Sequence, residues 1–303
     1  MRGKKHVLEF NNDKFPEALR QIPYPPKRLY CLGNPDALTE GLAIVGARRA
    51  TPYGLSCAKH FGEIAARAGV TIISGGAYGC DSESHRAALS VGGKTVVFLG
   101  GGCDKPYPVR NVNLYQDIID SGGAIVSENY WDCESYKSSF LQRNRLIAGL
   151  AKATLVVEAG VPSGTFTTAD FAIDAGKELL AVPGPITYSG SRGCNRLIYQ
   201  GAIPVVDDDV FYDFLYTTYN VIRPSDIKTE QKVKHGEKVG QSNNPILEAL
   251  SAQPINMDQL YEFAKTQCGR ENPNVWLSKK LVEAESSGKI TKYKNGMYGP
   301  VVR

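Results

Sequence analysis

Residues 41–49 read Gly-Leu-Ala-Ile-Val-Gly-Ala-Arg-Arg, and residues 51–54 continue with Thr-Pro-Tyr-Gly. The apolar run that stops at Gly46 predicts a strand, and the Thr-Pro pair predicts the cap and first turn of a helix. Arg48 and the arginine after it therefore lie beside the amide end of a helix, at the carboxyl end of a strand. Because the helix dipole and the unpaired amides favour an anion there, this turn predicts a phosphate site. The phosphate belongs either to a small nucleotide or to a nucleic-acid backbone.

The same order of short apolar strand, glycine-rich turn and helix continues along most of the chain. Strands are predicted at 42–45, 70–74, 95–99, 124–126, 154–158, 179–182 and 203–206, and helices at 53–68, 81–90, 111–121 and 167–175. Strands that are apolar throughout are buried on both faces, which indicates parallel strands with helices on each side. The glycines follow the strands, at the edge where open α/β sheets bind ligands. The predicted fold class is α/β, a Rossmann-like doubly wound and mostly parallel sheet.

This predicted sheet domain spans residues 41–220, and residues 1–40 precede it. The short segment 15–26 contains four prolines, which favour an extended backbone. We therefore expect residues 1–40 to form an N-terminal arm that packs on the core.

A small second domain is predicted at the end of the chain. Residues 221–243 are polar and charged, as in a flexible linker. Residues 244–303 regain helical patterns at 246–250, 257–265 and 274–287, followed by a polar hairpin with a turn at Asn295-Gly296. Helices followed by a two-stranded wing predict a winged-helix-like domain, and a small helical dimerisation module is the alternative.

The composition excludes several classes of protein. The 303 residues carry a net charge of +4, with 42% hydrophobic residues, as in ordinary globular proteins. No apolar run approaches the ~20 residues of a membrane span, and the first residues lead into no apolar signal core. The seven cysteines include no Cys-x-x-Cys pair, which indicates a reduced, cytoplasmic protein without a cysteine zinc site. We expect no membrane contact and no metal.

A second basic cluster, Gln142-Arg143-Asn144-Arg145, precedes an apolar helix predicted at 146–150. In an extended segment Arg143 and Arg145 point to the same side, whereas in a helix they diverge. We expect the extended form, with both arginines at a phosphate. A salt bridge that holds the loop is the alternative for each.

Two more loops have the composition of an anion site. Ser163, Gly164 and Thr165 lie between a predicted strand and helix, where amides and hydroxyls can bind an oxyanion. Plain N-capping by Thr167 or Thr168 is the alternative.

The other loop, residues 191–198, contributes Asn195 and Arg196 at a helix entry. Each of these loops is weak evidence by itself. Because all of them follow strands of one sheet, we expect them to form one anion-binding edge.

Catalytic residues are scarce in this sequence. His85 is expected to be a hydrogen-bonded helix residue rather than a general base, and Asp81 to cap its helix. The sequence has no Gly-x-x-x-x-Gly-Lys-Ser/Thr loop, no serine elbow and no Gly-x-Gly-x-x-Gly that opens a helix. We therefore predict no cofactor, NAD included.

Short motifs along residues 15–215 match those of one known family in order. They are Tyr24-Pro-Pro-Lys-Arg-Leu-Tyr, Ala43-Ile-Val-Gly-Ala-Arg48, Ser74-Gly75, Tyr107-Pro108, Ser127-Glu128, Phe140 with Arg143-Asn-Arg-Leu-Ile-Ala-Gly-Leu, Ser163-Gly164, Ala181-Val-Pro-Gly184 and Gly193-Cys-Asn195-Arg-Leu-Ile. In these motifs the chain resembles the DNA-processing protein A (DprA/Smf) family. The resemblance implies a Rossmann-like homodimer that binds single-stranded DNA and helps to load RecA recombinase during natural transformation. It also implies a winged helix, with which many members end.

Three positions depart from the motifs of that family. Ala47 stands where a serine is usual, Tyr78 where an arginine is usual, and Leu141 where a proline is usual. An aromatic ring at Tyr78 can stack on a base, which contributes about 1–3 kcal/mol. The exchange would replace an ionic contact with a stacking contact.

The leading hypothesis is a non-catalytic single-stranded DNA-binding protein. In it, Arg48, Arg143 and Arg145 hold the phosphate backbone together with the amides around Gly164 and Asn195. The rival is a nucleotide phosphoribohydrolase, similar to cytokinin-activating relatives with the same kind of sheet. Their Pro-Gly-Gly-x-Gly-Thr-x-x-Glu motif requires a catalytic glutamate where this chain has Thr168. A third hypothesis is a nucleotide-sensing or partner-docking module.

The C-terminal domain carries lysines that suit duplex DNA. They are Lys279, Lys280, Lys289, Lys292 and Lys294. A solvated basic face is the alternative.

Overall fold

The computed structural model describes residues 1–221, 246, 250, 255–269, 271–286, 290–293 and 297–300. The chain divides into two units, Met1–Gln231 and Lys232–Arg303. The predicted linker at 221–243 lies outside the described residues apart from its first position.

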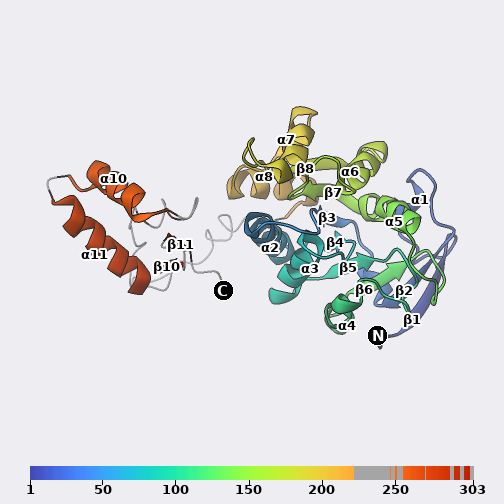
Figure 1. Cartoon of the computed structure of the whole chain (residues 1–303). Helices are drawn as coiled ribbons and strands as arrows, with labels where there is room; N and C mark the ends of the chain where they lie inside the picture. The colour runs from blue at the N-terminus through green and yellow to red at the C-terminus, as the bar shows by residue number, and fades with distance from the viewer. Residues whose placement is uncertain are drawn as a thin grey trace, which may run out of the picture. The chain divides into compact units, whose positions relative to one another are not determined.

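The first unit is built on a nine-stranded sheet with the order β1-β2-β6-β5-β4-β3-β7-β8-β9 (Figure 1). The strands are β1 Lys5–Glu9, β2 Arg28–Gly33, β3 Gly41–Val45, β4 Ile72–Ser74, β5 Thr95–Phe98, β6 Ala124–Ser127, β7 Ala151–Val156, β8 Glu178–Ala181 and β9 Ile203–Pro204. Neighbouring strands from β6 to β9 in this order are parallel, while β2 runs antiparallel to β1 and to β6. Every residue of β3, β4, β5 and β6 is buried, as expected for strands with helices on both faces.

Helices cover the two faces of this sheet. They are α1 Glu17–Arg20, α2 Pro52–Arg67, α3 Cys80–Ser90, α4 Val112–Asp120, α5 Lys137–Leu150, α6 Thr165–Asp174, α7 Arg192–Tyr199 and α8 Asp208–Tyr219. Apolar side chains of α1, α5, α6 and α7 pack on one face, and those of α2, α3, α4 and α8 pack on the other. This arrangement confirms the α/β class and the mostly parallel sheet. None of the helices in the described part of the chain is long and apolar enough to cross a membrane.

The strand order places a switch point between β3 and β7. From β3 the chain adds β4, β5 and β6 in one direction, and β7, β8 and β9 are added in the other. In open α/β sheets, ligands bind in the crevice at the carboxyl ends of the strands where the order reverses. The Gly46–Arg48 turn follows β3 and therefore lies at this crevice.

The expectation of an extended N-terminal arm is wrong for this structure. Residues 5–9 and 28–33 form β1 and β2, which extend the sheet beyond β6, and α1 lies between them. Only Leu8 is buried in β1, so the strand has no apolar run that could reveal it. Pro23, Pro25 and Pro26 lie in the connection between α1 and β2, and Pro16 is the N-cap of α1, so the prolines do not form a continuous arm.

Within its described residues, the second unit has two helices that are described from end to end and a pair of antiparallel strands. They are α10 Met257–Gln267, α11 Pro273–Ser286, β10 Ile290–Lys292 and β11 Tyr298–Pro300, with β10 antiparallel to β11. Their core includes Leu260, Trp276 and Leu281, together with Ile246 and Leu250. The predicted turn at Asn295-Gly296 and most of the predicted 246–250 helix lie outside the described residues.

His85 of α3 lies in the interior of the first unit. Its Nδ1 lies 2.6 Å from the hydroxyl of Thr95, and its Nε2 has no hydrogen-bond partner. Burial lowers the pKa of His85 to about 3, so the ring is neutral in the folded protein near neutral pH. The helical, hydrogen-bonded histidine predicted from the sequence is confirmed, although its partner is a side chain rather than backbone.

His85→Leu is expected to weaken the acid sensitivity of folding. The unfolded histidine gains a proton below its ordinary pKa of 6.5, which the folded one does not accept until about 3. Between these values His85 lowers the free energy of unfolding by about 1.4 kcal/mol per pH unit as the pH falls. Above 6.5 it contributes no slope.

Urea unfolding of both proteins, in steps from about pH 7 to about pH 5, measures this effect. Contributions of other groups, such as the buried Asp81, cancel in the difference between the two proteins. The expected result is a stability difference that is nearly constant near pH 7 and approaches a slope of about 1.4 kcal/mol per pH unit toward pH 5. Parallel pH profiles would show that the folded histidine titrates normally.

Candidate functional site

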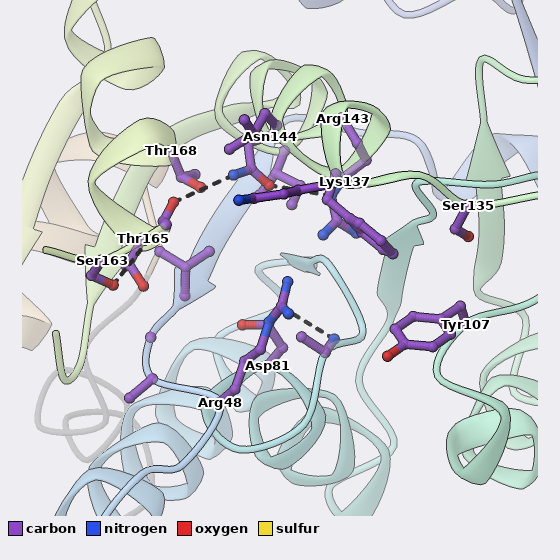
Figure 2. A pocket seen from close by; sticks show the side chains of 18 residues that line it. Arg48, Asp81, Tyr107, Ser135, Lys137, Arg143, Asn144, Ser163, Thr165 and Thr168 are labelled. Carbon is purple, nitrogen blue, oxygen red and sulfur yellow. Dashed lines mark hydrogen bonds between the residues drawn. The ribbon is translucent and has the colours of Figure 1, made fainter. Parts of the chain in front are cut away.

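A pocket of about 760 Å³ lies at the carboxyl edge of the sheet, at the switch point. It is lined from four directions: by Gly46, Ala47 and Arg48 after β3, by Tyr107 after β5, by Lys137, Phe140, Arg143 and Asn144 of α5, and by Ser163, Gly164, Thr165 and Thr168 around the start of α6. Figure 2 shows Arg48 entering from one side and Lys137 from the opposite side. We call this cavity the main pocket.

Cations and aromatic rings lie together in the main pocket. The guanidinium carbon of Arg48 lies 5.7 Å from the ring centre of Phe140, and that of Arg143 lies 5.9 Å from it. The ring centres of Tyr107 and Phe140 are 5.5 Å apart. Arg48 and Lys137 are exposed, so both charges are available to a ligand. Positive charge beside rings that are exposed or half-buried suits a phosphate that carries a base.

Arg143 is buried and already has its hydrogen-bond partners. Its Nη1 donates to the carbonyl oxygen of Gly75 at 2.6 Å and to the carbonyl oxygen of Phe98. Burial lowers the pKa of Arg143 to about 10, so it stays charged at neutral pH. Arg143 thus joins the ends of β4 and β5 beneath the main pocket.

Asp81 binds the same glycine turn from below. Its Oδ2 accepts hydrogen bonds from the amides of Gly75 at 3.2 Å and Ala77 at 3.3 Å. Burial raises the pKa of this carboxyl, and the nearby Arg143 opposes that shift. The predicted capping role is wrong, because α3 begins at Cys80 and the carboxylate binds the turn that precedes the helix.

The expected pairing of Arg143 with Arg145 is also wrong. Both lie within α5, which begins at Lys137, so their side chains point in different directions. Arg145 pairs with Glu128 and lines a separate hollow. The alternative of a salt bridge therefore describes Arg145.

The N-terminus of α2, where the sequence predicts a phosphate, holds a carboxylate of the chain itself. Thr51 caps this helix as predicted, and its side chain accepts from the amide of Gly54. The hydroxyl of Thr51 donates to Glu158 Oε2 at 2.5 Å, and its amide lies 3.2 Å from both carboxylate oxygens. The buried Glu158 thus neutralises the positive end of α2. The start of α2 is therefore already occupied by Glu158, and the exposed Arg48 is the group of this turn that is available to a phosphate.

The start of α6 faces no such carboxylate among the contacts of the described residues. The helix begins at Thr165, and its N-cap, Gly164, makes no side-chain hydrogen bond. Capping by Thr167 or Thr168 is therefore wrong. The Ser163 hydroxyl accepts from the Thr165 amide at 3.2 Å. This helix end adds partial positive charge opposite Arg48.

Residues 191–198, most of which form α7, do not line the main pocket. Asn195 binds the backbone of Gly184 through both its oxygen and its nitrogen, at 3.1 and 2.9 Å. Arg196 is exposed on α7. The prediction that Asn195 and Arg196 join the anion site is not supported by their positions.

Tyr78 lies next to the main pocket. It is 41% exposed and lines a small hollow of about 30 Å³ together with Arg48, Tyr107 and Phe140. A base stacked on Tyr78 would therefore be adjacent to a phosphate held by Arg48.

Sequence reasoning did not select Lys137, Phe140, Tyr107 or Asn144 as site residues. Lys137 is the first residue of α5, whereas the sequence predicts a helix only from residue 146. Nothing in the local sequence therefore predicts that the Lys137 side chain points into the main pocket. Asn144 reaches α6, where its Nδ2 lies 3.5 Å from the carbonyl oxygen of Gly164. Among the described residues, no cluster of three or more histidine, cysteine, aspartate or glutamate side chains could hold a metal ion.

Comparisons with known proteins identify relatives of this chain. Residues 6–215 match the family model of DNA recombination-mediator protein A. The chain is 40% identical over 205 residues to Protein Smf of Escherichia coli, an alignment that covers 67% of the chain and 55% of that relative. It is 36% identical over 205 residues to the DNA processing protein DprA of Streptococcus pneumoniae, covering 67% and 72%. The chain thus spans about half the length of the first of these relatives.

Solved structures agree with these matches. The X-ray structure of DNA processing protein A from Streptococcus pneumoniae superposes with a TM-score of 0.64 at 34% identity, over 69% of this chain and 74% of that one. DNA processing protein A from Helicobacter pylori, whose structure concerns its single-stranded DNA binding mode, gives 0.64 at 31% identity over 72% and 97%.

Proposed function

This chain belongs to the DNA recombination-mediator protein A family, and we propose that it binds single-stranded DNA in the main pocket without catalysing a reaction. The observation that carries the proposal is the position of Arg48 beside the ring of Phe140 at the switch point, with Lys137 on the opposite side of the main pocket. Arg48 and Lys137 bind phosphates, and the start of α6 adds further positive potential. Phe140, Tyr107 and Tyr78 provide stacking surfaces.

Such contacts predict the kind of nucleic acid that is bound. Backbone phosphates and ring faces carry no sequence code, so binding is sequence-tolerant and sensitive to salt. Bases must be unpaired to stack on side chains, so a single strand is preferred to a duplex. The relative from Helicobacter pylori, which binds single-stranded DNA, supports this assignment by analogy.

A labelled oligothymidylate is expected to bind more tightly than the duplex of the same length. Fluorescence anisotropy across a salt series measures both affinities. Each neutralised phosphate contributes about −0.7 to the slope of log affinity against log salt. With two exposed cations in the main pocket we expect a slope of about −1.4 or steeper. The proposal would be contradicted if the protein bound neither the single strand nor the duplex, or if it preferred the duplex.

The phosphoribohydrolase alternative lacks an available carboxylate. Asp81 is the one carboxylate among the residues that line the main pocket, and its oxygen accepts from two amides. Thr168 lines the pocket where the alternative requires a glutamate. Incubation with nucleoside monophosphates tests this directly, since release of free base would favour the alternative.

The family also suggests partners for the bound strand. We propose that the protein acts as a homodimer, delivers its strand to a RecA recombinase and functions in the cytoplasm. The seven free thiols support a reducing compartment.

For the second unit we propose a winged helix that contacts duplex DNA through residues such as Lys279 and Lys292. Lys289 and Lys294 lie outside the described residues.

A further inference from the structure

A second hollow lies at the same edge of the sheet, on another side of α5. Its volume is about 690 Å³, and its lining includes Tyr24, Lys27, Arg28, Glu128, Arg145 and Phe171. Glu128 follows β6, and Arg28 begins β2, which is antiparallel to β6. Both therefore lie at the carboxyl edge that also carries the main pocket. We call this second cavity the flanking hollow.

The flanking hollow carries more positive than negative charge. Lys27 and Arg28 are exposed. Arg28 pairs with Glu9 at 3.5 Å and donates a long hydrogen bond to the hydroxyl of Tyr30, also at 3.5 Å. Arg145 pairs through Nη2 with Glu128, while its Nη1 is buried without a hydrogen-bond partner. Three cations therefore face one carboxylate, which suits an anionic ligand.

An aromatic ring stands at the rim of this hollow. Tyr24 is 85% exposed, and its φ of +56° is in the left-handed region that residues other than glycine rarely adopt. The prolines on either side restrict the backbone around it. The ring is held outside the core beside Lys27 and Arg28, the combination by which proteins hold a base and its phosphate.

The two cavities share the same two helices. On α5, Leu141 and Asn144 line the main pocket, while Gln142 and Arg145 line the flanking hollow. On α6, Thr168 lines the main pocket and the flanking hollow begins one turn later, at Phe171. A helix is about 10–12 Å across with its side chains. A strand in the main pocket therefore reaches the flanking hollow within a few nucleotides.

We propose that the flanking hollow binds the continuation of the single strand that occupies the main pocket. Lys27 and Arg28 contact its phosphates, and Tyr24 stacks on one of its bases. The proposal rests on the function proposed above and adds a second subsite to it. The shortest oligomers fill the main pocket alone, whereas longer ones occupy both cavities.

Oligothymidylates of about 4 and about 16 nucleotides, the two ends of the range of site sizes, separate the cavities. The variants are Tyr24→Ala, Tyr24→Phe and the double variant Lys27→Gln/Arg28→Gln, with Lys59→Gln, an exposed lysine of α2, as the control. All the substituted side chains are exposed, so the variants are expected to fold as the unchanged protein does. Anisotropy across a salt series provides the affinities and the salt slopes.

For the long oligomer, we expect Tyr24→Ala to weaken binding about tenfold, while Tyr24→Phe and Lys59→Gln leave it unchanged. The double variant should reduce the salt slope by about 1.4. Affinity for the short oligomer should stay the same in every variant. Equal losses for both lengths, or no loss for the long one, would overturn the flanking subsite while leaving the main pocket intact. If the unchanged protein bound neither oligomer, the proposed function would fail as well.

Discussion

Arg48→Glu is expected to weaken the binding of single-stranded DNA by about 10- to 150-fold at low salt. A hydrogen bond to a charged group contributes about 1.5–3 kcal/mol, and the variant also places a like charge beside the phosphate. The side chain is exposed and follows β3, so the substitution removes a ligand contact rather than a part of the core. The measurement is anisotropy with a labelled oligothymidylate.

Arg49→Glu is the matched control for this result. Arg49 is also exposed and is not among the residues that line the main pocket. Arg49→Glu changes the net charge of the protein by the same amount as Arg48→Glu. We expect a much smaller loss of affinity, which disappears as salt screens long-range charge. Equal losses in Arg48→Glu and Arg49→Glu would mean that the strand responds to overall charge and not to the pocket.

Arg143→Ala is expected to lower the free energy of unfolding by about 3–5 kcal/mol, the cost of removing one partner from a buried charged network. The variant leaves the carbonyl oxygens of Gly75 and Phe98 without their donor. It also removes the positive charge that opposes the raised pKa of Asp81. Urea unfolding at neutral pH measures the loss.

Lys137→Ala separates this structural role from ligand binding. Lys137 lies on the same helix and lines the same pocket, but it is exposed. We expect its free energy of unfolding to change by no more than about 0.5 kcal/mol, while its affinity for the strand falls. If Arg143→Ala were as stable as Lys137→Ala, the buried guanidinium would not hold the strand ends together.

The sheet could be predicted because its central strands are apolar throughout. Burial on both faces leaves an uninterrupted run, as at 41–45. Strand β1 could not be predicted in this way, because only Leu8 of its residues is buried. Helix α5 was placed too late because its first half is polar, and its contacts with α6 and the strand ends are long-range.

The site could be predicted only where a residue adjoins one of these strands in the sequence. Arg48 stands next to the strand that positions it, so local sequence suffices. Arg145 was assigned to the wrong cavity because its direction depends on where α5 begins. The carboxylate at the start of α2 comes from Glu158, 107 residues beyond Thr51, and nothing near Thr51 in the sequence announces it.

Glu158 has a consequence for how quickly a strand leaves. When the amides of a helix N-terminus bind a phosphate, their positions are fixed relative to one another, so all of these hydrogen bonds must break together for the phosphate to dissociate. Here the Glu158 carboxylate already occupies the amides of α2. If the protein binds a strand as proposed, the full charges that contact it belong to long, flexible side chains at the surface, and each of them can release independently. A competing strand or protein could then replace these contacts one nucleotide at a time. A protein that transfers a bound strand to another protein needs this stepwise dissociation.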